Sequence, residues 1–151
     1  MSLVASRNVL IPAGPDAVWS VLADGYSYTD WVVGTREIRY VDPGWPQPGS
    51  ALHFTAGWGP FTIADKTTSR ICEPRRRLEL EAHALPYGSV RISIELLPWG
   101  EECVAIIDEH PLRGPSALLE NPIVEFVLTI RNRRMLRKLA QTVKRRRTLN
   151  R

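Results

Sequence analysis

The sequence predicts an α+β domain in which a curved antiparallel sheet packs against a long C-terminal helix. Short runs rich in β-branched residues alternate with Pro- and Gly-containing turns, as in an antiparallel meander. A long amphipathic segment follows Asn121-Pro122, a good N-cap and first-turn pair. The chain has 151 residues, of which 44% are hydrophobic and 24% charged, as expected for a globular protein. We therefore expect residues 1–151 to form one domain.

The N-terminal third is expected to hold one strand and one or two short helices. Residues 3–11 are mostly aliphatic and suit a strand. Pro12, Gly14 and Pro15 end it, and Pro15 is well placed to open a helix over residues 16–22. Gly25 ends that helix. The aromatic segment 26–31 is typical of either a second short helix or a tight turn.

Six further strands are expected between Gly34 and the C-terminal segment. They cover residues 37–42, 50–56, 61–72, 77–84, 89–97 and 103–110. With the first strand they give a sheet of about seven strands. Apolar and polar residues alternate over 77–84 and 89–97, which predicts one covered face and one solvent-exposed face.

The last helix is expected to run for roughly 25 residues from Pro122, about 37 Å at ~1.5 Å per residue. Its apolar residues fall near one stripe: Val124, Leu128, Met135, Leu139 and Val143. Residues 131–151 hold ten of the twenty Lys and Arg residues and no acid, so the body carries −6 and the tail +10. A solvated helix face explains this pattern. Weak contact with an anionic membrane is an alternative, and the chain lacks the motifs of a nucleic-acid-binding module.

The composition favours a cytoplasmic protein without metal or cofactor. Cys72 and Cys103 have no metal or redox spacing, and small buried thiols are the expected interpretation. The three histidines have no zinc-ligand spacing. The chain shows neither a nucleotide-binding glycine loop nor a G-x-S-x-G nucleophile motif, and no secretory signal or 20-residue apolar span.

Several strings, in order along the chain, resemble the SRPBCC superfamily, which includes START domains, the major birch pollen allergen and polyketide cyclases. They are Pro15-Asp-Ala-Val-Trp19, Tyr28 to Trp31, Pro46 to His53, Pro74-Arg-Arg-Arg-Leu78, Glu109 with Gly114-Pro115, and Arg131-Asn132 with Leu136. The resemblance implies a helix-grip fold, in which the sheet grips the last helix and leaves a cavity for lipids, polyketides or other apolar molecules.

Apolar residues of the strands and of the last helix are the expected walls of that cavity, although core packing explains the aromatic ones equally well. The candidates are Trp31, Phe54, Trp58, Phe61, Ile63, Ile92, Ile107, Val124, Leu128 and Met135.

Three polar residues are candidates for acid–base chemistry. Glu109 faces inward if Ala105 and Ile107 do, and a carboxylate in an apolar cavity has a raised pKa. A structural tie to Arg131 or His53 is the favoured interpretation, and the opposite strand parity would place Asp108 inside instead. Asp65 and His53 are the other candidates; a β-bulge or a position at the rim explains them as well.

Three functional hypotheses follow. The first is reversible binding of a small hydrophobic or aromatic molecule, by a monomer or a homodimer. The second is a cofactor-free cyclase or dehydratase that uses Glu109, Asp65 or His53. The third is an interaction protein that docks on nucleic acid, anionic membrane or an acidic partner through its basic C-terminal helix.

Overall fold

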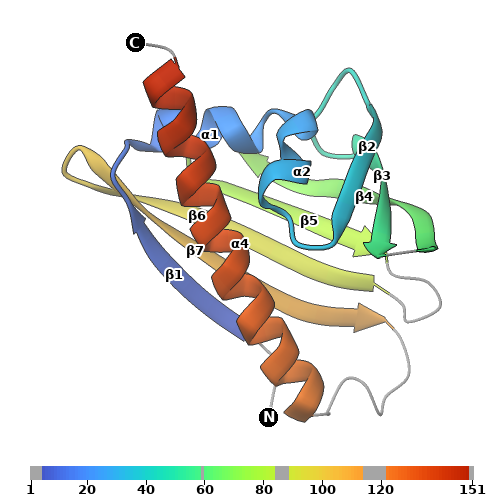
Figure 1. The fold of residues 1–151 in the computed structure, drawn as a ribbon. Helices are drawn as coiled ribbons and strands as arrows, with labels where there is room; N and C mark the ends of the chain where they lie inside the picture. The colour runs from blue at the N-terminus through green and yellow to red at the C-terminus, as the bar shows by residue number, and fades with distance from the viewer. Residues whose placement is uncertain (1–4, 59, 84–88, 114–121, 150–151) are drawn as a thin grey trace.

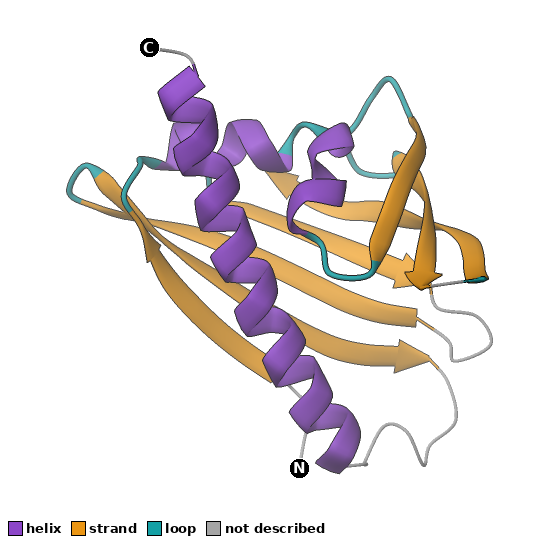
Figure 2. Ribbon diagram, in the orientation of Figure 1, coloured by secondary structure: helices purple, strands orange, loops and turns teal. Residues whose placement is uncertain are grey.

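The computed structural model describes residues 5–58, 60–83, 89–113 and 122–149. It has the predicted order: one strand, short helices, six strands and a long helix (Figures 1 and 2). The strands are β1 (Ala5–Ile11), β2 (Thr35–Val41), β3 (Ala51–Trp58), β4 (Phe61–Glu73), β5 (Arg77–His83), β6 (Ser89–Trp99) and β7 (Glu102–Arg113). The helices are α1 (Pro15–Leu22), the 3-10 turn η1 (Gly25–Ser27), α2 (Tyr28–Trp31) and α4 (Pro122–Leu149).

All seven strands form one antiparallel sheet in the order β1-β7-β6-β5-β4-β3-β2. Strands β2 to β7 form a meander, whereas β1 pairs with β7 at the far edge. The segment α1–η1–α2 therefore connects the two edges of the sheet. Figure 1 shows α4 lying across one face of the sheet, with α1 and α2 beside its C-terminal half. The predicted helix-grip architecture is confirmed.

The turn between α1 and α2 explains the glycine at position 25. A Cβ atom there would lie 2.8 Å from both Cγ atoms of Val41, which is closer than packed atoms allow. Asp24 precedes it, and its carboxylate accepts a hydrogen bond from the backbone N–H of Tyr26 at 3.1 Å. The aromatic segment thus forms both predicted features, a tight turn and a short helix, and the turn packs against β2.

Strand register fixes which residues face α4. Ile92 is opposite both Leu80 and Glu109, and Ile94 is opposite both Leu78 and Ile107. Because directly opposed residues share a face of the sheet, these residues all lie on the inner face. The inward orientation of Ala105, Ile107 and Glu109 is confirmed.

The outer face differs from the simple expectation of an exposed polar surface. Glu79 and Glu81 lie on this face of β5, yet they are only 5% and 8% exposed. Arg70 covers Glu81 with two hydrogen bonds of 2.8 and 3.0 Å to Oε1. Glu79 is paired with both Arg77 and Arg91. Long arginine side chains on β5 and on its two neighbouring strands thus cover carboxylates that the alternation alone would leave in solvent.

The 28-residue helix α4 is slightly longer than expected. Met135, Leu136, Leu139 and Val143 are all at most 3% exposed and join the core beneath the helix. The side chains of Val124 and Leu128, the expected N-cap Asn121 and the Gly114-Pro115 loop lie outside what the structure describes. The confirmed part of the apolar stripe is therefore the C-terminal half of the helix.

Candidate ligand-binding site

A cavity of about 110 Å³ lies between the inner face of the sheet, the segment from α2 to β2, and α4. Nine of its lining residues come from the sheet: Thr35, Leu52, Phe54, Ala56, Thr67, Leu80, Ala82, Ile92 and Ile94. The others come from α2, the following loop and α4: Tyr28, Trp31, Val32, Val33, Gly34, Arg131 and Met135. Most of this wall is apolar, as in typical small-molecule sites.

The register of four neighbouring strands assembles the sheet wall. Leu52 is opposite Thr67, and Thr67 is opposite Ala82, so one row of residues crosses β3, β4 and β5. Leu80 and Ile92 continue the wall onto β6. Small residues at positions 56, 67 and 82 leave space that the larger side chains around them do not fill.

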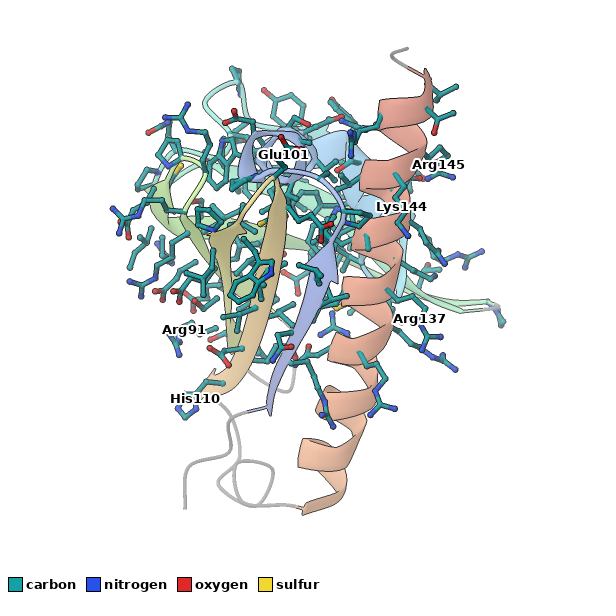
Figure 3. All side chains as sticks on the ribbon, turned by 90° about the vertical axis from the view of Figure 1, so that its left-hand side faces the viewer. Arg91, Glu101, His110, Arg137, Lys144 and Arg145 are labelled. Carbon is teal, nitrogen blue, oxygen red and sulfur yellow. The ribbon has the colours of Figure 1, made fainter. Side chains whose placement is uncertain are left out.

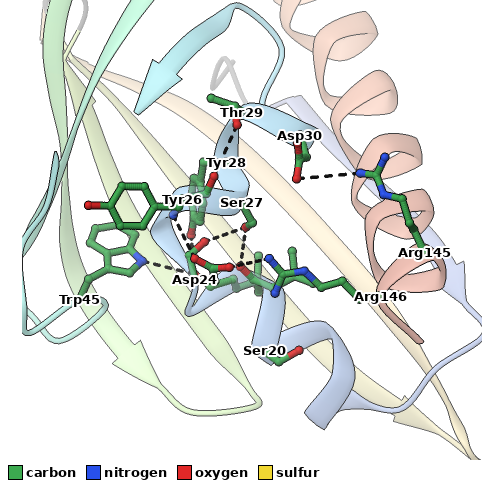
Figure 4. Close-up of polar contacts among 12 residues, drawn as sticks. Ser20, Asp24, Tyr26, Ser27, Tyr28, Thr29, Asp30, Trp45, Arg145 and Arg146 are labelled. Carbon is green, nitrogen blue, oxygen red and sulfur yellow. Dashed lines mark hydrogen bonds and ion pairs between the residues drawn. The ribbon is translucent and has the colours of Figure 1, made fainter. Parts of the chain in front are cut away.

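One part of the cavity wall is aromatic. Tyr28 and Trp31 have ring centroids 4.6 Å apart, and Trp45 meets Tyr28 edge-on at 5.7 Å. The Tyr28 hydroxyl donates to the Leu22 carbonyl at 2.8 Å (Figure 4). Burial raises the pKa of Tyr28 far above its ordinary value, so this hydroxyl stays protonated. The hydroxyl proton is therefore engaged with the carbonyl at the end of α1.

A buried ion pair lies beside the cavity. Glu109 of β7 is 0% exposed, and its Oε1 accepts a 2.7 Å hydrogen bond from Nη1 of Arg131 on α4. Burial raises the pKa of Glu109 above its ordinary value, and the Arg131 guanidinium opposes that rise. Arg131 lines the cavity, whereas Glu109 does not. The pairing is the structural tie that the sequence favoured.

Four predicted wall residues, Trp31, Phe54, Ile92 and Met135, do line the cavity. Ile107 is buried in the adjoining core, and Ile63 is 50% exposed at a position opposite Ala56. The side chains of Trp58, Phe61, Val124 and Leu128 lie outside the described part of the chain. That any of these residues contacts a ligand stays a prediction.

The other two acid–base candidates lie outside the cavity lining. Asp65 is opposite Phe54, on the inner face of the sheet, but its carboxylate accepts from the backbone N–H of Lys66 at 2.8 Å. His53 lies 3.3 Å from Asp42 through Nε2 and Oδ1. Both are partly exposed, as expected for positions near the rim.

Several cavity residues were not predicted. Leu80, Ala82 and Ile94 lie on the covered faces that the alternation predicts. Alternation alone does not distinguish a cavity wall from packed core. Val32 to Gly34 belong to a loop, and no periodicity marks a loop as a cavity wall. Arg131 was predicted as a partner of Glu109, as part of the basic C-terminal segment and in the family resemblance, but not as a lining residue.

Part of the basic tail is explained by contacts within the chain. Arg146 donates to Asp24 at 2.5 Å, and Arg145 lies 3.9 Å from Asp30, so the end of α4 is held against η1 and α2 (Figure 4). Arg137 and Lys144 are exposed side chains of α4 and are labelled in Figure 3. A membrane or partner contact by these exposed cations stays a prediction.

The described residues contain no cluster of three or more His, Cys, Asp or Glu side chains that could hold a metal ion. In the same part of the chain, no helix combines the length and apolar character needed to cross a membrane. Cys72 and Cys103 are free thiols, and burial raises the pKa of both.

The sequence of residues 3–144 matches the family described as polyketide cyclase/dehydrase and lipid transport. The chain belongs to this family. A search of curated proteins finds no match.

Solved structures support the same fold for this polyketide cyclase/dehydrase and lipid transport family member. Protein NE0264 from Nitrosomonas europaea is 14% identical, with a TM-score of 0.74 over 96% of both chains. The Zhui aromatase/cyclase from Streptomyces sp. R1128 is 16% identical, with a TM-score of 0.70 over 95% of this chain and 94% of its own. Ara h 8.0201 is 12% identical, with a TM-score of 0.68 over 93% and 96%. At these identities the likeness shows the fold alone.

Proposed function

We propose that this chain binds a small hydrophobic or aromatic molecule reversibly in the cavity between the sheet and α4. The observation that carries the proposal is the apolar wall, which five strands, α2 and α4 build together. Water in such a space finds few hydrogen-bond partners, so an apolar ligand gains free energy by replacing it. The description of the family, which includes lipid transport, supports the same function.

The size of the cavity limits the ligand. Its volume of about 110 Å³ is below the roughly 300–1,000 Å³ of pockets for drug-sized molecules. It is closer to the roughly 150 Å³ of apolar cavities known to hold benzene. A ligand with one aromatic ring, or a short aliphatic chain, therefore fits this conformation best.

Binding without chemistry is favoured over catalysis by the composition of the wall. Among the described residues, no Asp, Glu or His lines the cavity. A general acid or base must come within hydrogen-bond reach of the reacting group. Glu109, the buried carboxylate nearest to this role, is engaged by Arg131. Cyclase or dehydratase activity, which the family description also covers, is therefore the second hypothesis.

Two measurements test the proposal. Native mass spectrometry of freshly expressed protein, followed by organic extraction, is expected to show an apolar passenger at one copy per chain. Thermal unfolding with a panel of single-ring aromatic and short-chain aliphatic compounds is expected to show a raised midpoint, because a ligand that binds the folded state stabilises it. A clean apo mass together with no shift across the panel would contradict the proposal.

A further inference from the structure

Arg131 is the one charged residue in the described lining of the cavity. Its side chain is 31% exposed, whereas that of its partner Glu109 is 0% exposed. The guanidinium has five N–H donors, and the contact with Glu109 involves Nη1. Arg131 is thus a charged donor within the cavity lining, and Glu109, which is not part of that lining, holds its guanidinium through Nη1.

The other polar groups of the wall are weaker anchors for a ligand. The Tyr28 hydroxyl already donates to the Leu22 carbonyl. The Trp31 Nε1–H has no acceptor among the described residues, but protein atoms cover it completely. Thr35 and Thr67 offer uncharged hydroxyls, whose hydrogen bonds are weaker than those of a charged donor.

The ion pair also determines which acceptor suits Arg131. The Glu109 carboxylate balances the guanidinium charge at 2.7 Å, so the pair has no net positive charge to attract an anion. A ligand carboxylate would lose its hydration and gain little attraction in return. A neutral carbonyl oxygen loses less hydration and still accepts a charge-assisted hydrogen bond.

We propose that the ligand is a single-ring aromatic molecule with a neutral carbonyl oxygen that accepts a hydrogen bond from Arg131, and that Glu109 sets the preference for a neutral over an anionic acceptor. This inference rests on the proposed function, since it assigns the substrate class of the same cavity. Arg131 is the anchoring residue, and Glu109 acts through it as a positioning residue.

Three probes of nearly equal size test the inference by calorimetric titration. Acetophenone carries the carbonyl, ethylbenzene replaces it with a methylene group, and benzoate replaces it with a carboxylate. Acetophenone is expected to bind the wild-type chain about tenfold or more tightly than either of the others, in line with the net strength of a hydrogen bond to a charged group.

Two variants separate the roles of the pair. Glu109→Gln keeps the shape and an acceptor oxygen for Arg131 but removes the balancing charge, so the benzoate-to-acetophenone affinity ratio is expected to rise about tenfold. The double variant Arg131→Met/Glu109→Leu removes both charges together. It is expected to lose the preference for acetophenone over ethylbenzene, and the ethylbenzene binding that it retains reports that the cavity is intact.

The outcomes distinguish the two levels of the proposal. Equal wild-type affinity for acetophenone and ethylbenzene, or tighter binding of benzoate, would overturn the inference and leave the proposed function standing. An unchanged selectivity ratio in Glu109→Gln would overturn the role of Glu109. Failure of all three probes to bind the wild-type chain would overturn this inference, whereas the proposed function would fall only with a clean apo mass and no shift across the wider panel.

Discussion

Nη1 of Arg131 on α4 lies 2.7 Å from Oε1 of Glu109 on β7, so one ion pair joins the helix to the strand beside the cavity. Glu109 is fully buried, and its Oε2 has no partner among the described residues. Among the described residues, the carboxylate therefore depends on Arg131 for its hydrogen bond and its balancing charge. Losing the arginine leaves a buried acidic group that must either protonate or stay unpaired.

Replacing Arg131 with Met is expected to lower the free energy of unfolding by about 1–3 kcal/mol, the cost of a buried polar group without its partner. The double variant Arg131→Met/Glu109→Leu is expected to recover most of this loss, because both members of the pair are then apolar. Urea denaturation of the three chains measures the effect. Arg134→Met, at an exposed position one turn away, is the control and should change little. A double variant that is no more stable than Arg131→Met would contradict the coupling.

Replacing Tyr28 with Phe is expected to cost about 1 kcal/mol, because its hydroxyl donates a buried hydrogen bond to the Leu22 carbonyl. In a chain of this size that corresponds to a fall in the melting temperature of roughly 2–4 °C. Tyr26→Phe is the matched control, since Tyr26 is 58% exposed. Differential scanning calorimetry compares them, and equal melting temperatures for the two variants would rule out a stabilising role for this bond.

Two glutamates are expected to give opposite dependences of stability on pH. The Arg70 hydrogen bonds lower the pKa of Glu81 below its ordinary value of 4.5, so its contribution is present above that pH and is lost as the pH falls through the lowered pKa. Burial raises the pKa of Glu109 above 4.5. Its contribution is present below pH 4.5 and is lost as the pH rises through the raised pKa.

Urea midpoints measured between about pH 3 and pH 8 test these two opposite dependences of stability on pH. Glu81→Gln should flatten the loss of stability on the acid side, and Glu109→Gln should remove the decline that accompanies rising pH. The prediction for Glu109 is contradicted if Glu109→Gln leaves the slope of the urea midpoint against pH unchanged above pH 4.5.

The ion pair between Arg146 and Asp24 is expected to contribute about 0–1 kcal/mol, because both side chains are roughly one third exposed and are screened by solvent. A double-mutant cycle with alanine at both positions isolates this coupling from the separate role of Asp24 in capping η1. The pair of Arg145 and Asp30, at 3.9 Å and more exposed, is the comparison and should couple more weakly. Raising the salt concentration should lower the coupling free energy of both ion pairs. A coupling that stays the same in high salt would argue against an electrostatic origin.

The fold could be predicted from the sequence because its strands carry strong local signals. Alternation over 77–84 and 89–97 identified Leu78, Leu80, Ile92 and Ile94 as one face, and the structure buries all four. The parity of β7 could not be decided in the same way, because apolar residues occupy both faces of that strand. Pairing with β6, which places Glu109 opposite Ile92, decides it.

The site was harder to predict because it depends on register and on loops. Ala82 lines the cavity because β4 places Thr67 opposite it, and sequence spacing along one strand does not contain that information. Glu79 and Glu81 were expected in solvent, but arginines on neighbouring strands cover them. Cross-strand contacts of this kind become visible only once the strands are aligned.

The most direct test of ligand binding in this cavity is a calorimetric titration with acetophenone that compares Ala82→Leu with Ala64→Leu. Leucine at position 82 extends into the cavity, whereas Ala64 is exposed and opposite Thr55, outside the lining. The account predicts that Ala82→Leu abolishes binding without lowering the melting temperature, because the added carbon atoms fill existing space, and that Ala64→Leu binds as the wild type does. Wild-type affinity in a folded Ala82→Leu chain would contradict it.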